Sequence, residues 1–151
     1  LQVIKEICTS MAKKIAGDGE GATKLVECTV TGAPSIPLAK AIAKSVITSS
    51  LTKAAMFGAD ANWGRILCAI GYTAGDFAVD DIQVDISSPK GSILVCQNGA
   101  GVAFDEDIAK EILLEEEIHI EITMQQGDAT ATAWGCDLTY DYVKINGDYR
   151  T

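Results

Sequence analysis

The chain is poor in basic side chains and has a single histidine, and both shortages exclude classes of function. Lys and Arg number 12 against 21 Asp and Glu, which gives a net charge of −9. Sequence-independent binding to nucleic acid needs Lys and Arg for the phosphates, and anionic membrane surfaces attract the same side chains. Neither partner is expected here. His119 falls on the polar side of an alternating stretch, where a solvated residue is expected rather than a catalytic base.

Other common signatures are missing as well. No apolar run approaches the roughly 20 residues that a membrane span needs. The cysteines form no C-x-x-C pair, so we expect small buried side chains in a reducing compartment and no metal site. They are Cys8, Cys28, Cys68, Cys96 and Cys136. There is no Ser-His-Asp set, P-loop or dinucleotide-binding glycine motif, so no complete catalytic set is visible and no bound cofactor is expected.

The composition that is present belongs to a folded chain with mixed helices and strands. With 151 residues, 48% of them apolar, the chain can form one sizeable core or two small lobes. Residue spacing predicts helices over 1–16, 35–49 and about 60–71, and a further helix that begins at Asp105. It predicts strands over 24–31, 82–86, 93–96 and 117–125, and an extended region over 129–145. The apolar segment 51–57 is of uncertain type. The hairpins of the second half favour an α+β fold, with helices layered on a mixed, mainly antiparallel sheet.

The stretch GDGEGATK at 17–24 places two acids among three glycines, between a predicted helix and a predicted strand. Glycine permits positive φ and close approach of a ligand, so a carboxylate on such a turn can be aimed at a cation. Taken alone, the composition favours an ordinary turn.

Two further segments stand out. GADANWGR at 58–65 reads mainly as a capped helix start, in which Asp60 or Asn62 accepts from free amides and Arg65 is solvated or paired. The tail CDLTYDYVKINGDYRT at 136–151 contains Asn-Gly, which predicts a turn, and it can present Asn146 and Thr151 to a ligand.

Together, GDGEGATK at 17–24, GADANWGRI at 58–66 and the closing tail resemble the C-terminal part of the β chain of the glutamate N-acetyltransferase (ornithine acetyltransferase) family of arginine biosynthesis. The resemblance implies an N-terminal-nucleophile type of enzyme with a small C-terminal lobe. Residues 1–33 would belong to its main catalytic layers and residues 34–151 to the C-terminal lobe with a substrate-binding tail. In this family a precursor cleaves itself before a threonine, which then carries acetyl from N-acetylornithine to glutamate. Acetyl-CoA is a second donor in some members.

The resemblance points to Glu20, Asn146 and Thr151 as substrate-binding residues. Glu20 suits a substrate ammonium, and Asn146 and the Thr151 hydroxyl can donate to a carboxylate. The terminal carboxylate could hold an ammonium instead, and the sequence does not decide between these assignments. Asp18 is a further candidate, for which fixing the turn is the favoured role. The nucleophilic threonine, the oxyanion hole and a substrate-binding lysine would all precede Leu1. No catalytic residue is therefore expected in this chain, and the chain alone is expected to be inactive.

The implied partners are an α chain, the upstream part of the β chain, the substrates N-acetylornithine and glutamate, and further αβ units in an oligomer. The expected location is the cytoplasm, or the mitochondrial matrix in a eukaryote. The chain begins without methionine inside a helical pattern, as expected of a fragment or a processed product. Two alternatives remain: a non-catalytic amino-acid-binding module, and a fragment of a related N-terminal-nucleophile aminopeptidase.

Overall fold

The structure is a computed structural model that describes residues 1–149, and its elements follow one another as mixed helices and strands. In chain order they are α1 (Gln2–Gly17), β1 (Leu25–Ala33), α2 (Ile36–Thr48), α3 (Ser50–Phe57), α4 (Trp63–Gly71), β2 (Gln83–Ser88), β3 (Gly91–Gln97), β4 (Ala100–Gly101), α5 (Glu106–Leu113), β5 (Glu117–Thr123), β6 (Ala129–Cys136) and α6 (Tyr140–Asp148).

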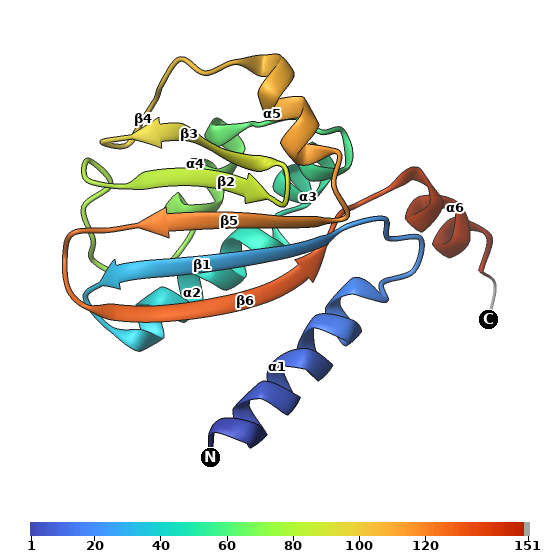
Figure 1. The fold of residues 1–151 in the computed structure, drawn as a ribbon, viewed down its shortest axis with the longest axis horizontal. Helices are drawn as coiled ribbons and strands as arrows, with labels where there is room; N and C mark the ends of the chain where they lie inside the picture. Colours follow the sequence, from blue (N-terminus) through green and yellow to red (C-terminus); the bar gives the residue numbers. More distant parts are fainter. Residues whose placement is uncertain (150–151) are drawn as a thin grey trace.

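The strands form one six-stranded sheet in the order β4-β3-β2-β5-β1-β6. β1 runs parallel to β5, and the other neighbours are antiparallel. Helices α2, α3 and α4 cover one face of this sheet (Figure 1). The expected α+β class, with helices on a mixed and mainly antiparallel sheet, is confirmed.

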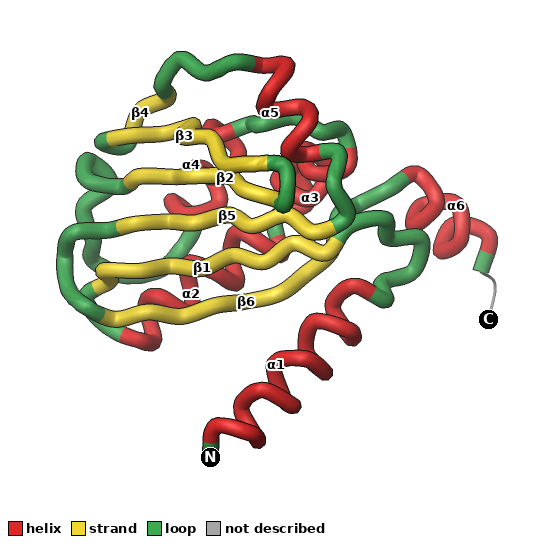
Figure 2. Tube along the Cα trace, in the orientation of Figure 1, coloured by secondary structure: helices red, strands yellow, loops and turns green. Residues whose placement is uncertain are grey.

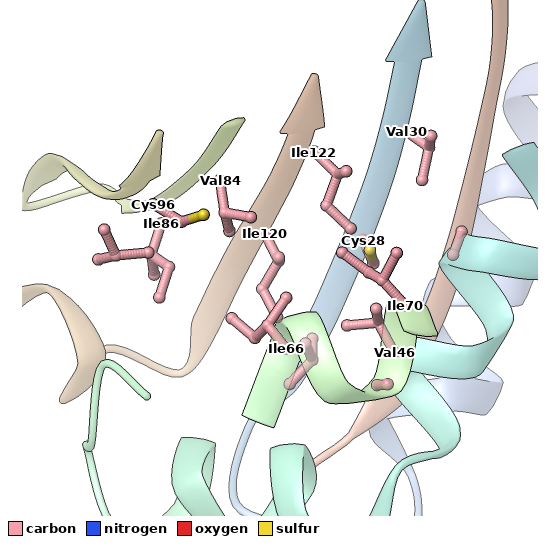
Figure 3. Close-up of a cluster of buried hydrophobic side chains, with 14 of the residues drawn as sticks. Cys28, Val30, Val46, Ile66, Ile70, Val84, Ile86, Cys96, Ile120 and Ile122 are labelled. Carbon is pink, nitrogen blue, oxygen red and sulfur yellow. The ribbon is translucent and has the colours of Figure 1, made fainter. Parts of the chain in front are cut away.

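The core lies between that face and the helices. Buried and partly exposed positions alternate along β1 and β5, because successive strand side chains point to opposite faces. Figure 3 shows the inward side chains meeting the apolar sides of α2 and α4. The labelled strand residues are Cys28, Val30, Val84, Ile86, Cys96, Ile120 and Ile122, and the labelled helix residues are Val46, Ile66 and Ile70.

The last part of the chain differs from expectation. The residue spacing predicts an extended region over 129–145, but β6 ends at Cys136 and α6 begins at Tyr140. The Thr139 hydroxyl accepts the Tyr142 N–H and so caps the helix, and Asp141 in its first turn suits the positive end of the helix dipole. Asn146 and Gly147 therefore lie within a helix and not in the predicted turn. The alternating aromatics that suggested a strand are largely solvent-exposed.

Two smaller expectations also change. The unassigned segment 51–57 is helix α3, which begins where the Ser49 side chain accepts the Thr52 N–H. Cys28 and Cys96 are buried as expected, but Cys8 and Cys68 are exposed and Cys136 is partly exposed. Cys8 is exposed because α1, although amphipathic, buries none of its residues against this chain.

The predicted boundary near residue 33 falls at the end of β1. In the structure β1 pairs with β5 and β6, which belong to the other side of that boundary. The assignment of residues 1–33 to the main catalytic layers of a longer protein, and of residues 34–151 to a C-terminal lobe, stays a prediction. No helix among the described residues is long and apolar enough to cross a membrane.

Candidate functional site

Two segments far apart in the sequence meet at one end of the sheet. We call residues 18–24, between α1 and β1, the acidic-glycine loop. The short connection from β6 to α6 runs beside it, and Figure 2 shows both as loops between the sheet and the terminal helices. Asp137 N–H donates to the Lys24 carbonyl over 3.2 Å, so the two segments are joined through their backbones.

The acidic-glycine loop turns sharply to reach α6. Ala22 N–H donates to the Gly19 carbonyl over 2.9 Å, and Gly21 has a φ of +68°, in the left-handed region. A Cβ atom at Gly21 would lie 2.8 Å from the Tyr142 nitrogen and 3.0 Å from Asp141. Only glycine fits both this φ and this close approach, so the backbone of the loop packs directly on the first turn of α6.

This packing brings Glu20 and Asn146 together. Asn146 Nδ2 donates to Glu20 Oε2 over 2.9 Å and also to the Tyr142 carbonyl over 2.9 Å. The two side chains are 126 positions apart in the sequence, and both are exposed to solvent. Two of the residues that the resemblance selected are therefore direct neighbours on the surface.

The other selected residues are less informative. The Asp18 N–H closes the end of α1 on the Lys14 carbonyl. Its carboxylate was expected to fix the turn, but it makes no hydrogen bond to another described residue. Thr151 lies outside the described residues. In the second motif, Asn62 caps α4 by accepting the Arg65 N–H over 3.1 Å, and Arg65 Nη1 donates to the Leu51 carbonyl. This motif has the structural role expected for it.

A second carboxylate, Glu27, lies on the open face of the sheet and differs from Glu20. Its Oε2 is 2.7 Å from both Lys13 Nζ and Trp134 Nε1, and its Oε1 is 3.6 Å from His119 Nδ1. Burial alone would raise the pKa of Glu27, but the bonds from Lys13 and Trp134 outweigh it and hold that pKa below its usual value. Because Glu27 is already paired with the cation of Lys13, whereas Glu20 accepts from the neutral Asn146 amide, Glu20 is the better candidate for a substrate cation.

Behind the loop lies a buried polar cluster that the sequence does not predict. Lys24, Asp137 and Thr139 are buried, and all three lie where the acidic-glycine loop meets the start of α6. Burial lowers the pKa of Lys24, an effect that the nearby Asp137 carboxylate partly offsets. In the sequence, Lys24 and Asp137 appear only as charged residues next to the ends of two strands. Because they are 113 positions apart, no local pattern indicates that they are in contact.

No group of three or more His, Cys, Asp or Glu side chains among residues 1–149 is arranged to hold a metal ion. The cysteines in this range are all free.

Comparison with known proteins places this arrangement in context. The model of the ArgJ family matches residues 1–151. The chain is 51% identical over 150 residues to "Arginine biosynthesis bifunctional protein ArgJ" of Caldanaerobacter subterraneus, covering 99% of this chain and 37% of that protein. The protein of the same name from Bacillus subtilis is 49% identical, over 95% of this chain and 34% of its own length.

A solved structure agrees with the fold. The crystal structure of the arginine biosynthesis bifunctional protein argJ from Bacillus halodurans matches with a TM-score of 0.91 at 43% identity. The match covers 98% of this chain and 68% of that one. The chain thus spans little more than a third of the length of the curated relatives, at 37% and 34%.

Proposed function

The chain belongs to the ArgJ family, and from that premise we propose that it is the C-terminal part of a glutamate N-acetyltransferase. The longer protein would move an acetyl group from N-acetylornithine to glutamate in arginine biosynthesis. An acetyl-threonine intermediate would divide this transfer into two easier steps. The threonine and the oxyanion hole would lie in the remainder of the protein. Acetyl-CoA would be a second acetyl donor, and no bound cofactor is required.

The observation that carries this proposal is the Glu20–Asn146 pair. An asparagine amide group has two N–H donors, and in Asn146 one is directed to Glu20 and the other to the Tyr142 carbonyl. Turning the amide over would place its oxygen against these two acceptors, so the orientation follows from the neighbours. Among residues 1–149, the Asn146 Oδ1 and the second carboxylate oxygen of Glu20 make no hydrogen bond and are left for a ligand. Both of these accept hydrogen bonds.

Two acceptors, one of them charged, suit a primary ammonium group. Ornithine and glutamate both carry one, and a charge-assisted hydrogen bond to it is worth about 1.5–3 kcal/mol. The geometry therefore favours an ammonium for Asn146 as well, over the carboxylate that the sequence left open. The substrate carboxylate would be bound by other groups, among which Thr151 stays a prediction.

The rest of the protein would cover the apolar side of α1. Five large apolar side chains on this helix are solvent-exposed in the described structure: Val3, Ile4, Ile7, Met11 and Ile15. The opposite side, with Lys5, Thr9 and Lys13, faces the sheet across a hollow of about 540 Å³ that Glu27 and Trp134 also line. An exposed apolar stripe of this kind marks an interaction surface. We propose that the upstream part of the β chain or the α chain packs there.

The test uses the longer protein that contains this chain. Purified enzyme is incubated with N-acetylornithine and glutamate, ornithine release is measured, and the acetyl adduct is sought on a threonine by mass spectrometry. Glu20→Gln keeps the size of the side chain and removes its charge, so kcat/KM should fall roughly tenfold to a few hundredfold. Glu111→Gln, on the exposed surface of α5, is the matched control and should match the parent enzyme.

Parent-like kinetics for Glu20→Gln in both half-reactions would remove Glu20 from the site. Absence of ornithine release and of any acetyl adduct in the parent would favour the amino-acid-binding module. The 151-residue chain by itself is expected to release no ornithine.

A further inference from the structure

The buried polar cluster behind the loop is the feature that the proposed function leaves unused. Polar groups, and charged ones above all, are costly to bury unless they are paired and hydrogen-bonded. Lys24, Asp137 and Thr139 are only 8%, 3% and 5% exposed. The apolar core lies elsewhere, between the sheet and its helices, so this cluster has a different task from core packing.

Asp137 holds the end of the acidic-glycine loop. Its Oδ1 accepts the Thr23 N–H over 2.8 Å and the Lys24 N–H over 3.0 Å, and its Oδ2 accepts the Thr23 hydroxyl. The backbone bond from the Asp137 N–H to the Lys24 carbonyl completes the set. A carboxylate that accepts three such bonds fixes the direction in which the loop enters β1.

Lys24 ties the same point to the body of the protein. Its Nζ donates to the Met56 carbonyl and to the Leu113 carbonyl, each over 2.6 Å. These carbonyls belong to the last turns of α3 and α5, which are the ends of helices that attract a positive charge. The loop is therefore anchored to two helices as well as to the β6–α6 connection.

Thr139 holds the middle of the loop against α6. Its hydroxyl donates to the Gly21 carbonyl over 2.7 Å and accepts the Tyr142 N–H over 3.2 Å. One side chain thus caps α6 and fixes the residue that follows Glu20. Tyr142 in turn offers its carbonyl to Asn146 Nδ2. The positions of Glu20 and Asn146 therefore both depend on the bonds that Thr139 makes.

We propose that Thr139 and Asp137 are positioning residues for the ammonium subsite, acting through Glu20 and Asn146 and touching no substrate themselves. This inference rests on the proposed function. Glu20 and Asn146 are exposed, and each side chain has several rotamers available. The backbone contacts of Thr139 with Gly21 and Tyr142 therefore keep the two residues close enough to bond. Preorganisation of this kind increases binding because less ordering remains to be done when the substrate arrives.

The test is a double-mutant cycle in the longer protein, with kcat and KM measured for N-acetylornithine and for glutamate. Thr139→Val keeps the shape and removes both hydroxyl bonds, and kcat/KM should fall roughly 3- to 30-fold, chiefly through KM. Thr139→Ser restores a hydroxyl and should restore KM. In a background that carries both Glu20→Gln and Asn146→Leu, the same Thr139→Val change should have little further effect, because both residues through which it acts are already replaced.

Ser35→Ala is the matched control, since Ser35 caps α2 in the same way but contacts neither the loop nor α6. It should leave KM unchanged while lowering the Tm as Thr139→Val does. Asp137→Asn, which keeps the shape and removes the charge, gives a second cycle if Thr139→Val does not yield folded protein.

The outcomes separate the two proposals. If Glu20→Gln has no effect, the ammonium subsite and the proposed function are wrong together. If Glu20→Gln impairs the enzyme but Thr139→Val leaves KM unchanged, the positioning role is wrong and the subsite stands. The positioning role is also wrong if Thr139→Val lowers kcat/KM by the same factor in the parent and in the Glu20→Gln, Asn146→Leu background, because a merely structural threonine would act equally in both. Losses that fail to multiply, with rescue by serine, support the positioning role.

Discussion

The helices at the two ends of the chain are held in opposite ways, although neither buries a residue. α1 has no side-chain cap at its first turn, and it is fastened by Lys13, whose Nζ lies 2.7 Å from Glu27 Oε2 and 3.3 Å from Glu117 Oε1. α6 is capped by Thr139, packs on Gly21, and places Tyr140 edge-on to Phe57 with ring centroids 5.5 Å apart. Figure 1 shows both helices outside the layers of the sheet and its helices.

The difference indicates separate tasks. Helices in proteins owe most of their stability to the packing of an apolar face, and the apolar face of α1 is directed to solvent in the described structure. α1 therefore has the character of an interface that is incomplete without more protein. α6 also exposes large apolar side chains, among them Val143 and Ile145. It differs from α1 in being fixed by specific polar and backbone contacts through Thr139 and Gly21, as expected of an element that positions side chains for a ligand.

The largest expected effect is on the apolar face of α1. In the longer protein, Ile7→Asp would place an unpaired carboxylate in the proposed interface, at a cost of several kcal/mol. We expect loss of assembled protein by size-exclusion chromatography and a marked drop in Tm. Gln2→Asp introduces the same charge on the opposite side of the same helix and should be tolerated. Equal behaviour of the two variants would mean that nothing covers this face.

The next effect concerns Asn146. Asn146→Leu keeps the approximate size and suits a helix, but it removes the acceptor proposed for the ammonium and the bond to Glu20. We expect kcat/KM to fall roughly 5- to 100-fold, from about 1–3 kcal/mol for an unpaired group, with the Tm nearly unchanged. Lys144→Leu on the same helix is the control. If both substitutions give the same small loss, Asn146 serves only the helix.

The sequence predicts well those elements whose pattern is local. The alternation over 117–125 follows from one buried face of β5, and the alternation over 24–31 follows likewise from β1. The prediction for the tail is wrong because alternating tyrosines imitate a strand, whereas the cap at Thr139 that starts α6 is completed by contact with Gly21. The type of that segment is decided by a tertiary contact.

The site divides in the same manner. Glu20 and Asn146 are selected by motif resemblance, and no local property of either residue indicates that they touch. The bonds of Asp137 to Thr23 and Lys24 join positions 114 and 113 residues apart, and such pairs exist only once the sheet has brought β1 beside β6. The motifs therefore predict the exposed pair, whereas the buried cluster that holds it becomes visible only in the folded chain.

A smaller effect is expected at the ring contact of α6. Phe57→Leu removes the edge-on contact with Tyr140, and such contacts contribute about 0.5–1.5 kcal/mol. We expect kcat/KM to fall roughly 2- to 10-fold as α6 loosens over the acidic-glycine loop. Phe77→Leu makes the same change at a ring that packs against the core, and its effect should appear in the Tm and not in KM. A KM that responds equally to both would show that α6 is held without Phe57.

The smallest effect concerns the pH dependence of the α1 attachment in the 151-residue chain. The pKa of Glu27 is held below its usual value, so its contribution to stability is present above the unfolded-state pKa and is lost as pH falls through the folded-state pKa. The hydrogen bond to Glu27 raises the pKa of Lys13, so its contribution is present below the usual lysine pKa and is lost only as pH rises through that raised value. Acid, and not neutral pH, should therefore release the helix.

Trp134 reports this release because its Nε1 donates to Glu27 Oε2 over 2.7 Å. In a Trp63→Phe background, its emission should shift as the pH is lowered from about 6 to about 2, and the shift should fall below the ordinary glutamate range because the pKa of Glu27 is lowered. The change in unfolding free energy should stay below about 1 kcal/mol, since the ion pair is partly exposed. Glu27→Gln should abolish the emission shift, and Glu121→Gln, an exposed residue on the same face, should preserve it. An emission shift that survives Glu27→Gln would mean that α1 is held by contacts other than its ion pairs, and the contrast with α6 would then lose its electrostatic basis.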